Sequence, residues 1–117
     1  MTLSKDDREK LSALSQSLPQ KFRLQLTPEC KAQLAAVSAN PQREGLEFQI
    51  KAAITKLLHD PKYKGLNTHR FRALSEKYQC DVWESYVQNN TPGAWRLFWR
   101  YGPDEKDITL LLVTPHP

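Results

Sequence analysis

The sequence predicts an α+β fold: an antiparallel four-stranded sheet with a helical pair packed on one face, plus an extra N-terminal helix. Three observations lead to this prediction. Strand-like runs separated by short turn-like breaks fill residues 81–117. Two stretches within residues 28–59 repeat apolar residues at helical spacing, and residues 21–26 alternate apolar and polar side chains. The chain has 117 residues, which suits one domain with a single modest core.

The first twenty residues predict a short helix that precedes the main domain. A capping-box-like start at Ser4 comes before three leucines at helical spacing, and Pro19 closes the segment. The leucines are Leu11, Leu14 and Leu18. We therefore divide the chain into a helical extension over residues 1–20 and a main domain over residues 21–117.

A strand and then a helix are predicted over residues 21–40. The alternation over residues 21–26 is typical of a half-buried strand. Thr27 and Pro28 have the chemistry of a helix start, with threonine as the N-cap and proline in the first turn. We expect this helix to end at Asn40, because the residue before a proline avoids the helical region.

The next helix is the clearest element of the sequence. Its apolar residues recur at intervals of three and four, which places them on one face. They are Leu46, Ile50, Ala53, Ile54, Leu57 and Leu58. Asp60, followed by a proline, ends the pattern. Two antiparallel helices joined by a short polar loop are therefore expected within residues 28–59.

Residues 61–80 are basic and have little periodicity. Gly65 marks a turn. We interpret residues 68–74 as a strand, because apolar and basic side chains alternate there.

The run from residue 95 to residue 101 separates two kinds of side chain. Because side chains alternate along a strand, Arg96, Phe98 and Arg100 share one face. The opposite face holds Trp95, Leu97, Trp99 and Tyr101. We interpret the aromatic face as core and the arginine face as a contact for a polyanion. Residues 108–113 are apolar on both faces, which predicts a central strand covered on both sides.

Basic residues are concentrated in the middle of the chain. The formal net charge is +4, and residues 62–101 alone hold seven Lys and Arg against three Asp and Glu. A local basic excess favours a nucleic acid or another acidic partner. A solvated basic surface without a partner fits the same pattern.

The cysteines, the histidines and the N-terminus narrow the class of protein further. Cys30 and Cys80 are too few for a disulfide framework or a zinc site. The three histidines lack the spacing of metal ligands, so we predict no metal and no cofactor. The N-terminus has no signal-peptide pattern, and no apolar run has membrane-spanning length. We therefore predict a cytoplasmic protein without membrane contact.

Four phrases of the sequence, in order, resemble the RelE/ParE toxin superfamily of bacterial type II toxin–antitoxin systems. They are LLHDPKYKGLNTHRF, DVWE, GAWRLFWRY and DITLLLVTPH. The resemblance covers residues 21–117 and leaves the N-terminal helix outside. It implies one of two activities: RelE-like members are metal-free endoribonucleases that cut messenger RNA, many of them on the ribosome, and ParE-like members inhibit DNA gyrase. It also implies a cognate antitoxin as partner, and it leaves the oligomeric state open.

The resemblance favours the RelE-like branch without excluding the alternatives. A ParE-like gyrase inhibitor and a non-catalytic module that binds nucleic acid or protein have the same fold, and fold alone does not decide function.

Three positions match catalytic positions of the nuclease branch. Arg96 matches the strand arginine that stabilises the scissile phosphate, His116 matches a histidine at the end of the last strand, and Glu84 matches an acidic residue used as a base in one subgroup. Two positions depart from the pattern. Tyr86 stands where many members carry arginine, and Pro117 follows the histidine where some nucleases carry tyrosine. Both departures favour the alternatives without nuclease activity.

Metal-free RNA cleavage uses the neighbouring 2′-hydroxyl as nucleophile and needs a base, an acid and cations around the phosphate. Arg96 and Arg100 are the candidate phosphate clamp, His116 is the candidate acid or base, and His69 is a second candidate for that role. Glu84 can act as base only if it shares a face with Arg96. The residues that we expect to contact RNA are Lys62, Lys64, Arg70, Arg72, Tyr86, Phe98 and Arg100. Tyr101 is a further candidate for stacking on a base.

Overall fold

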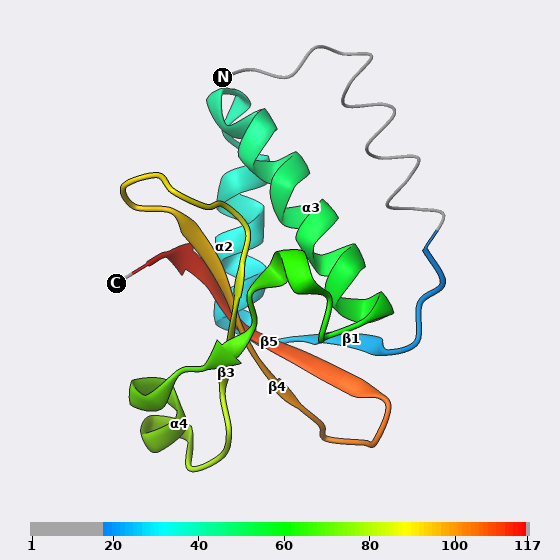
Figure 1. The fold of residues 1–117 in the computed structure, drawn as a ribbon. Helices are drawn as coiled ribbons and strands as arrows, with labels where there is room; N and C mark the ends of the chain where they lie inside the picture. Colours follow the sequence, from blue (N-terminus) through cyan, green and yellow to red (C-terminus); the bar gives the residue numbers. More distant parts are fainter. Residues whose placement is uncertain (1–17, 117) are drawn as a thin grey trace.

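The computed structural model describes residues 18–116. The predicted N-terminal helix therefore lies outside the described residues, apart from the end of its segment. Within the described part, helices occupy one side of a twisted sheet, and a shorter helix lies on the other side (Figure 1). No helix among residues 18–116 is both long enough and apolar enough to cross a membrane.

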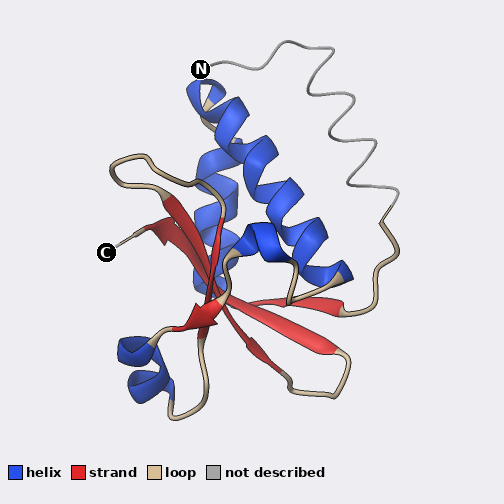
Figure 2. Cartoon of the chain, in the orientation of Figure 1, coloured by secondary structure: helices blue, strands red, loops and turns tan. Residues whose placement is uncertain are grey.

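The sheet has five strands in the order β1-β5-β4-β3-β2. They are β1 (Arg23–Leu26), β2 (His69–Arg70), β3 (Trp83–Tyr86), β4 (Trp95–Tyr101) and β5 (Asp107–Pro115). Strands β2 to β5 pair antiparallel with their neighbours, and β1 pairs parallel with β5 (Figure 2). The predicted four-stranded, purely antiparallel sheet was therefore wrong in strand number and in the direction of β1. Short loops predict antiparallel pairing only for strands consecutive in sequence, and β1 pairs with the last strand of the chain.

Two helices cover one face of the sheet, as the sequence predicts. Helix α2 spans Pro28–Ser38, and helix α3 spans Glu44–His59. The Thr27 side chain accepts a hydrogen bond from the backbone N–H of Cys30 at 3.1 Å, which is the expected N-cap. A 3-10 turn (η1, Pro41–Arg43) joins the two helices, and Asp60 ends α3 in extended conformation.

The main core lies between these two helices and the sheet. Its buried members are Cys30, Val37, Ile50, Ala53, Leu57, Leu58, Leu66, Leu97, Trp99, Ile108, Leu110 and Val113. The predicted aromatic core face of β4 is confirmed for Leu97 and Trp99, which belong to this core, and for Trp95, which packs against it. It was wrong for Tyr101, which is 46% exposed at the end of the strand. Burial also raises the pKa of the Cys30 thiol to about 11, so this cysteine is a neutral core residue.

A third helix, α4 (Arg72–Tyr78), replaces most of the strand predicted over residues 68–74. Only β2 (His69–Arg70) is extended there. Phe71, Leu74 and Tyr78 all pack on one small core, which is helical spacing of three and four that the short alternation concealed. The Ser75 hydroxyl fixes the helix, because it accepts from the Val82 N–H at 2.9 Å and donates to the Phe71 carbonyl at 2.8 Å.

A second, smaller core lies on the α4 side of the sheet. It consists of Val82, Phe98 and Leu111, with α4 packed over them. A β-bulge makes it possible: Phe98 pairs with Leu112 and the next residue of β4 pairs with Leu110, so Leu111 is left over. Strand β5 lies between β1 and β4, and the sequence prediction of a central strand covered on both faces is confirmed.

Candidate active site

Polar side chains from four segments meet on the α4 side of the sheet, where the helix does not reach. Glu84 and Tyr86 come from β3 and Arg96 from β4. In the register Tyr86 lies opposite Arg96, and Glu84 lies opposite a residue of the small core. His69 pairs with Glu84 across β2 and β3. His116 follows β5, and its backbone N–H donates to the Ala94 carbonyl at 2.8 Å. We call His69, Glu84, Tyr86, Arg96 and His116 the Glu84 cluster.

The carboxylate of Glu84 is the centre of this cluster. The residue is 1% exposed, yet both of its oxygens face imidazole rings. Glu84 Oε1 lies 2.8 Å from His69 Nε2, and Glu84 Oε2 lies 3.5 Å from His116 Nε2. Oε2 makes no hydrogen bond within residues 18–116. Both histidine side chains are about half exposed, so they separate the carboxylate from solvent.

The contacts of His69 fix the orientation of its ring. Its Nδ1 lies 2.9 Å from the carbonyl oxygen of Asn67, which can only accept, so Nδ1 carries a hydrogen. Its Nε2 faces a carboxylate oxygen of Glu84, which also accepts when ionised. The imidazole is thus the polar partner that the structure gives this carboxyl group. A buried carboxylate requires such a partner, because an unpaired charge in the interior is very costly.

The guanidinium of Arg96 is held by its surroundings rather than by an acidic side chain. Arg96 is 7% exposed, and its Cζ lies 3.6 Å from the centre of the Tyr86 ring. Its Nη1 donates to the carbonyl oxygens of Gln88 and Trp95. Its Nε has no hydrogen-bond partner in the described part of the chain. The guanidinium is thus fixed in place with one buried donor unused.

The three residues predicted as catalytic, Arg96, His116 and Glu84, therefore lie around one point on the same side of the sheet. Tyr86 also lies there, under the guanidinium. Burial of Glu84 changes what it can do: a substrate cannot reach its carboxylate past the two histidines in this arrangement.

Most of the residues predicted to contact RNA lie elsewhere. Phe98 cannot stack on a base, because it is 1% exposed and packs edge-on against Phe71 beneath α4. Arg70 pairs with Asp81 at 2.9 Å, and both side chains are exposed. The remaining arginines are Arg72, which pairs with Glu76 along α4, and Arg100, which is half-buried at the far end of β4.

Lys62 and Lys64 lie on the other face of the sheet. They line a pocket with Trp83 and Trp99, two residues that face the helical side. The basic residues that we expected to contact RNA are therefore divided between the two faces of the sheet, and Lys62 and Lys64 lie outside the Glu84 cluster.

The sequence indicated His69 as a second candidate, but it did not indicate that Glu84 is its partner. The two residues are fifteen positions apart, and they meet only because β2 pairs with β3. The signal was weak because a two-residue strand has no periodicity to detect. Within residues 18–116, no group of three or more His, Cys, Asp or Glu side chains is arranged to hold a metal ion.

Comparison with known proteins shows which solved structures have a similar fold. No protein-family model matches the chain, and no curated protein sequence matches it. Among solved structures, the chain is similar to a YoeB/ParE toxin from Agrobacterium tumefaciens, with a TM-score of 0.63 and 10% identity, over 82% of this chain and 100% of that one. It is also similar to the archaeal RelE–RelB complex from Pyrococcus horikoshii, with a TM-score of 0.56 and 11% identity, over 81% of this chain and 94% of the matched chain. The strand, helix pair and sheet described above are therefore the fold that these two toxin structures share.

Proposed function

We propose that this protein is a RelE-like toxin that cleaves messenger RNA without a metal ion. The observation that carries the proposal is the Glu84 cluster: a buried carboxylate between two half-exposed histidines, with a fixed arginine beside them. Such an acid–base set is what RNA cleavage needs, whereas a module that only binds a protein has no use for it.

The cleavage proceeds by attack of the RNA 2′-oxygen on the adjacent phosphorus. His116 takes the proton of the 2′-hydroxyl, the P–O5′ bond breaks, and His69 gives its proton to the departing 5′-oxygen. The products are a 2′,3′-cyclic phosphate and a 5′-hydroxyl end. We assign the acid to His69 because its ring is half exposed and lies beside the buried Glu84 carboxyl group, on the opposite side from His116.

Arg96 stabilises the negative charge that develops on the phosphate oxygens, since a guanidinium is always charged and can bind two oxygens at once. Its stacking on Tyr86 fixes its plane before substrate arrives. Glu84 is a positioning residue in this scheme. Its carboxylate orients both imidazoles, and this role replaces the role of direct base that sequence resemblance implied.

The test is cleavage of RNA by the purified protein in the presence of excess EDTA, with the ends of the products identified. Arg96→Ala is expected to lower the cleavage rate about 10²–10³-fold, as loss of one charge-stabilising donor does. Arg96→Lys is expected to restore little, because an ammonium lacks the planar fork. Arg43→Ala, which removes an arginine over Trp95 on the helical side, is the matched control and should cleave normally.

Intact RNA with folded protein and ribosomes present would overturn the proposal. One feature favours the ParE-like alternative: Tyr86 occupies a position where nuclease relatives carry arginine, and it lies under Arg96 rather than facing a substrate. A change in DNA supercoiling on expression in bacteria, with transcripts intact, would select that alternative.

We further propose that the chain has an antitoxin partner and works in the cytoplasm. The support is the archaeal neighbour, which was solved as a RelE–RelB complex. Coexpression with the gene that flanks this one should yield a stable complex in which RNA cleavage is suppressed.

A further inference from the structure

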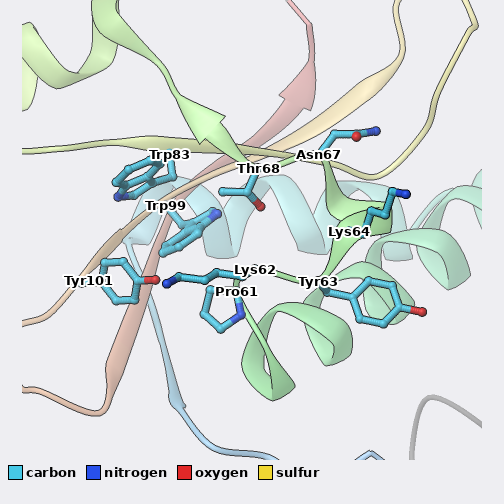
Figure 3. Close-up of a pocket in the computed structure, with 9 residues that line it drawn as sticks. All are labelled: Pro61, Lys62, Tyr63, Lys64, Asn67, Thr68, Trp83, Trp99 and Tyr101. Carbon is cyan, nitrogen blue, oxygen red and sulfur yellow. The ribbon is translucent and has the colours of Figure 1, made fainter.

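A pocket of about 460 Å³ lies on the helical side of the sheet, away from the Glu84 cluster (Figure 3). It is lined by Pro61, Lys62, Tyr63, Lys64, Asn67, Thr68, Trp83, Trp99 and Tyr101. The loop that follows α3 forms one side, and three rings from β3 and β4 form the other (Figure 3). Its size falls in the range of small-molecule sites. We call it the Tyr101 pocket.

Aromatic rings make up much of its wall. The indoles of Trp83 and Trp99 stack with ring centres 6.3 Å apart and planes 30° apart, and Tyr101 meets Trp99 edge-on at 5.0 Å. Tyr63 and Tyr101 are the two large hydrophobic residues that residues 18–116 leave exposed, at 40% and 46%. That both line the same pocket points to a ligand with a planar, apolar face.

The floor of the pocket is fixed before any ligand arrives. The indole N–H of Trp99 donates to the Ser85 hydroxyl at 2.8 Å, and Ser85 shares a hydrogen bond with the Thr68 hydroxyl at 2.7 Å. Ser85 is fully buried, so this chain of hydrogen bonds is protected from water. A preformed site loses less entropy when it binds. Beside it, the buried indole N–H of Trp83 has no hydrogen-bond partner among residues 18–116.

Positive charge lies along the loop side. Lys62 and Lys64 are exposed, and neither forms an ion pair within the described range. The nearby acid is Asp60, whose side chain accepts from the Lys62 backbone N–H. Burial raises the pKa of the Tyr101 hydroxyl, and the negative charge of Asp60 raises it further, so this hydroxyl stays neutral. Two lysines against one carboxylate leave the mouth of the pocket positive.

We infer that the Tyr101 pocket binds a nucleobase with its adjoining phosphate, the base against the exposed rings and the phosphate on Lys62 and Lys64. Aromatic platforms next to basic side chains are how single-stranded nucleic acids are held without sequence preference. The site is distinct from the Glu84 cluster. Consecutive residues of one strand point to opposite faces, so Trp83 lines the pocket while Glu84 belongs to the cluster. Thr68 and His69 divide in the same way.

This division gives the pocket a place in RNA binding. Strand β2 is the edge of the sheet, so a single-stranded RNA that passes around this edge can occupy both sites at once. The same chemistry also fits a free nucleotide, and the experiment below separates these two sources.

The test is titration of the full chain with three probes: AMP, adenosine and a tetradeoxyadenylate, which lacks the 2′-hydroxyl needed for cleavage. Tryptophan fluorescence reports binding, since Trp83 and Trp99 line the pocket. We expect saturable quenching by at least one phosphate-bearing probe and much weaker quenching by adenosine. Equal binding of AMP and the oligonucleotide identifies a free nucleotide as sufficient, whereas binding of the oligonucleotide alone identifies a strand site.

Two pairs of variants locate the binding. Tyr101→Leu should weaken it about tenfold through lost stacking, and Tyr101→Phe should bind like the parent. The double change Lys62→Ala and Lys64→Ala should also weaken it about tenfold and reduce its salt dependence, whereas Lys31→Ala on α2 should not. AMP cannot be cleaved by attack of a 2′-oxygen on a neighbouring phosphate, so this test stands even if the protein does not cleave RNA.

Three results would overturn the inference. They are the absence of saturable quenching by every phosphate-bearing probe, unchanged affinity in the double lysine variant with its fold intact, and binding of an acidic, phenylalanine-containing peptide in place of nucleotides.

Discussion

The two faces of the sheet differ in how they use buried space. On the helical face, α2 and α3 cover a continuous apolar core in which Leu57, Leu97 and Leu110 are fully buried. On the opposite face, α4 covers only a small core, and the next buried residues are Glu84 and Arg96. That face holds a buried carboxylate oxygen and a buried guanidinium nitrogen without hydrogen bonds inside residues 18–116.

The two faces therefore contribute differently to the stability of the fold. Burying apolar side chains stabilises the fold, whereas burying charged groups is costly unless each is paired. The helical face supplies the first contribution, and the opposite face carries the buried charged groups. The Tyr101 pocket lies at the edge of the stable face, where rigid rings are available as a platform.

The largest expected effect comes from Glu84→Gln, on the face that carries the Glu84 cluster. Loss of the buried charge removes the group that orients both imidazoles, so we expect RNA cleavage to fall about 10²–10⁴-fold. The fold should persist, because glutamine has the same shape and its amide can donate to neutral His69. Glu47→Gln, at an exposed Lys51 pair on α3, is the control. A changed pH–rate profile distinguishes this positioning role from simple unfolding, and undiminished cleavage would contradict the assignment.

The next effect comes from Leu57→Ala, on the helical face. Removing a fully buried leucine should lower the free energy of unfolding by about 2–5 kcal/mol, measured by urea denaturation. Cleavage per folded molecule should stay unchanged well below the midpoint, because the side chain lies across the sheet from the Glu84 cluster. If Leu57→Ala instead removed activity from folded protein, the two faces would be coupled and the comparison would fail.

The smallest expected effect concerns Asp107, which lies opposite Arg23 where β5 pairs with β1. Asp107 is 2% exposed, and its carboxylate accepts from Arg23 Nε at 2.9 Å and from the Asp104 backbone N–H at 3.1 Å. The hydrogen bond from Arg23 is the main cause that lowers the pKa of Asp107. A lowered pKa gives stability that is present above the unfolded value, about 3.9, and is lost as pH falls through the folded value.

Asp107→Asn should therefore lower stability at neutral pH and leave a shallower loss of stability below about pH 4. Thermal unfolding followed between pH 2 and pH 7 measures both. An unchanged acid limb would mean that other carboxyl groups control it.

Local sequence signals predicted the elements whose cause is local. The N-cap of α2 at Thr27, the end of α3 at Asp60 and the alternating faces of β4 follow from neighbouring residues, and all were found as expected. The sequence did not predict helix α4, because a seven-residue helix has only about two turns of periodicity. Arg70 and Arg72 also alternate with apolar residues, which is the pattern of a strand.

The sequence by itself determined which residue types were present for chemistry, and it predicted Arg96, Glu84 and His116 as a set. Only the tertiary structure decided what each can do. Pairing of β2 with β3 brought His69 onto Glu84 and buried the carboxylate, and α4 covered Phe98. The parallel pairing of β1 with β5 was decided in the same way. These features depend on contacts between segments far apart in the chain, and spacing along the sequence carries no information about which strand becomes the neighbour of which.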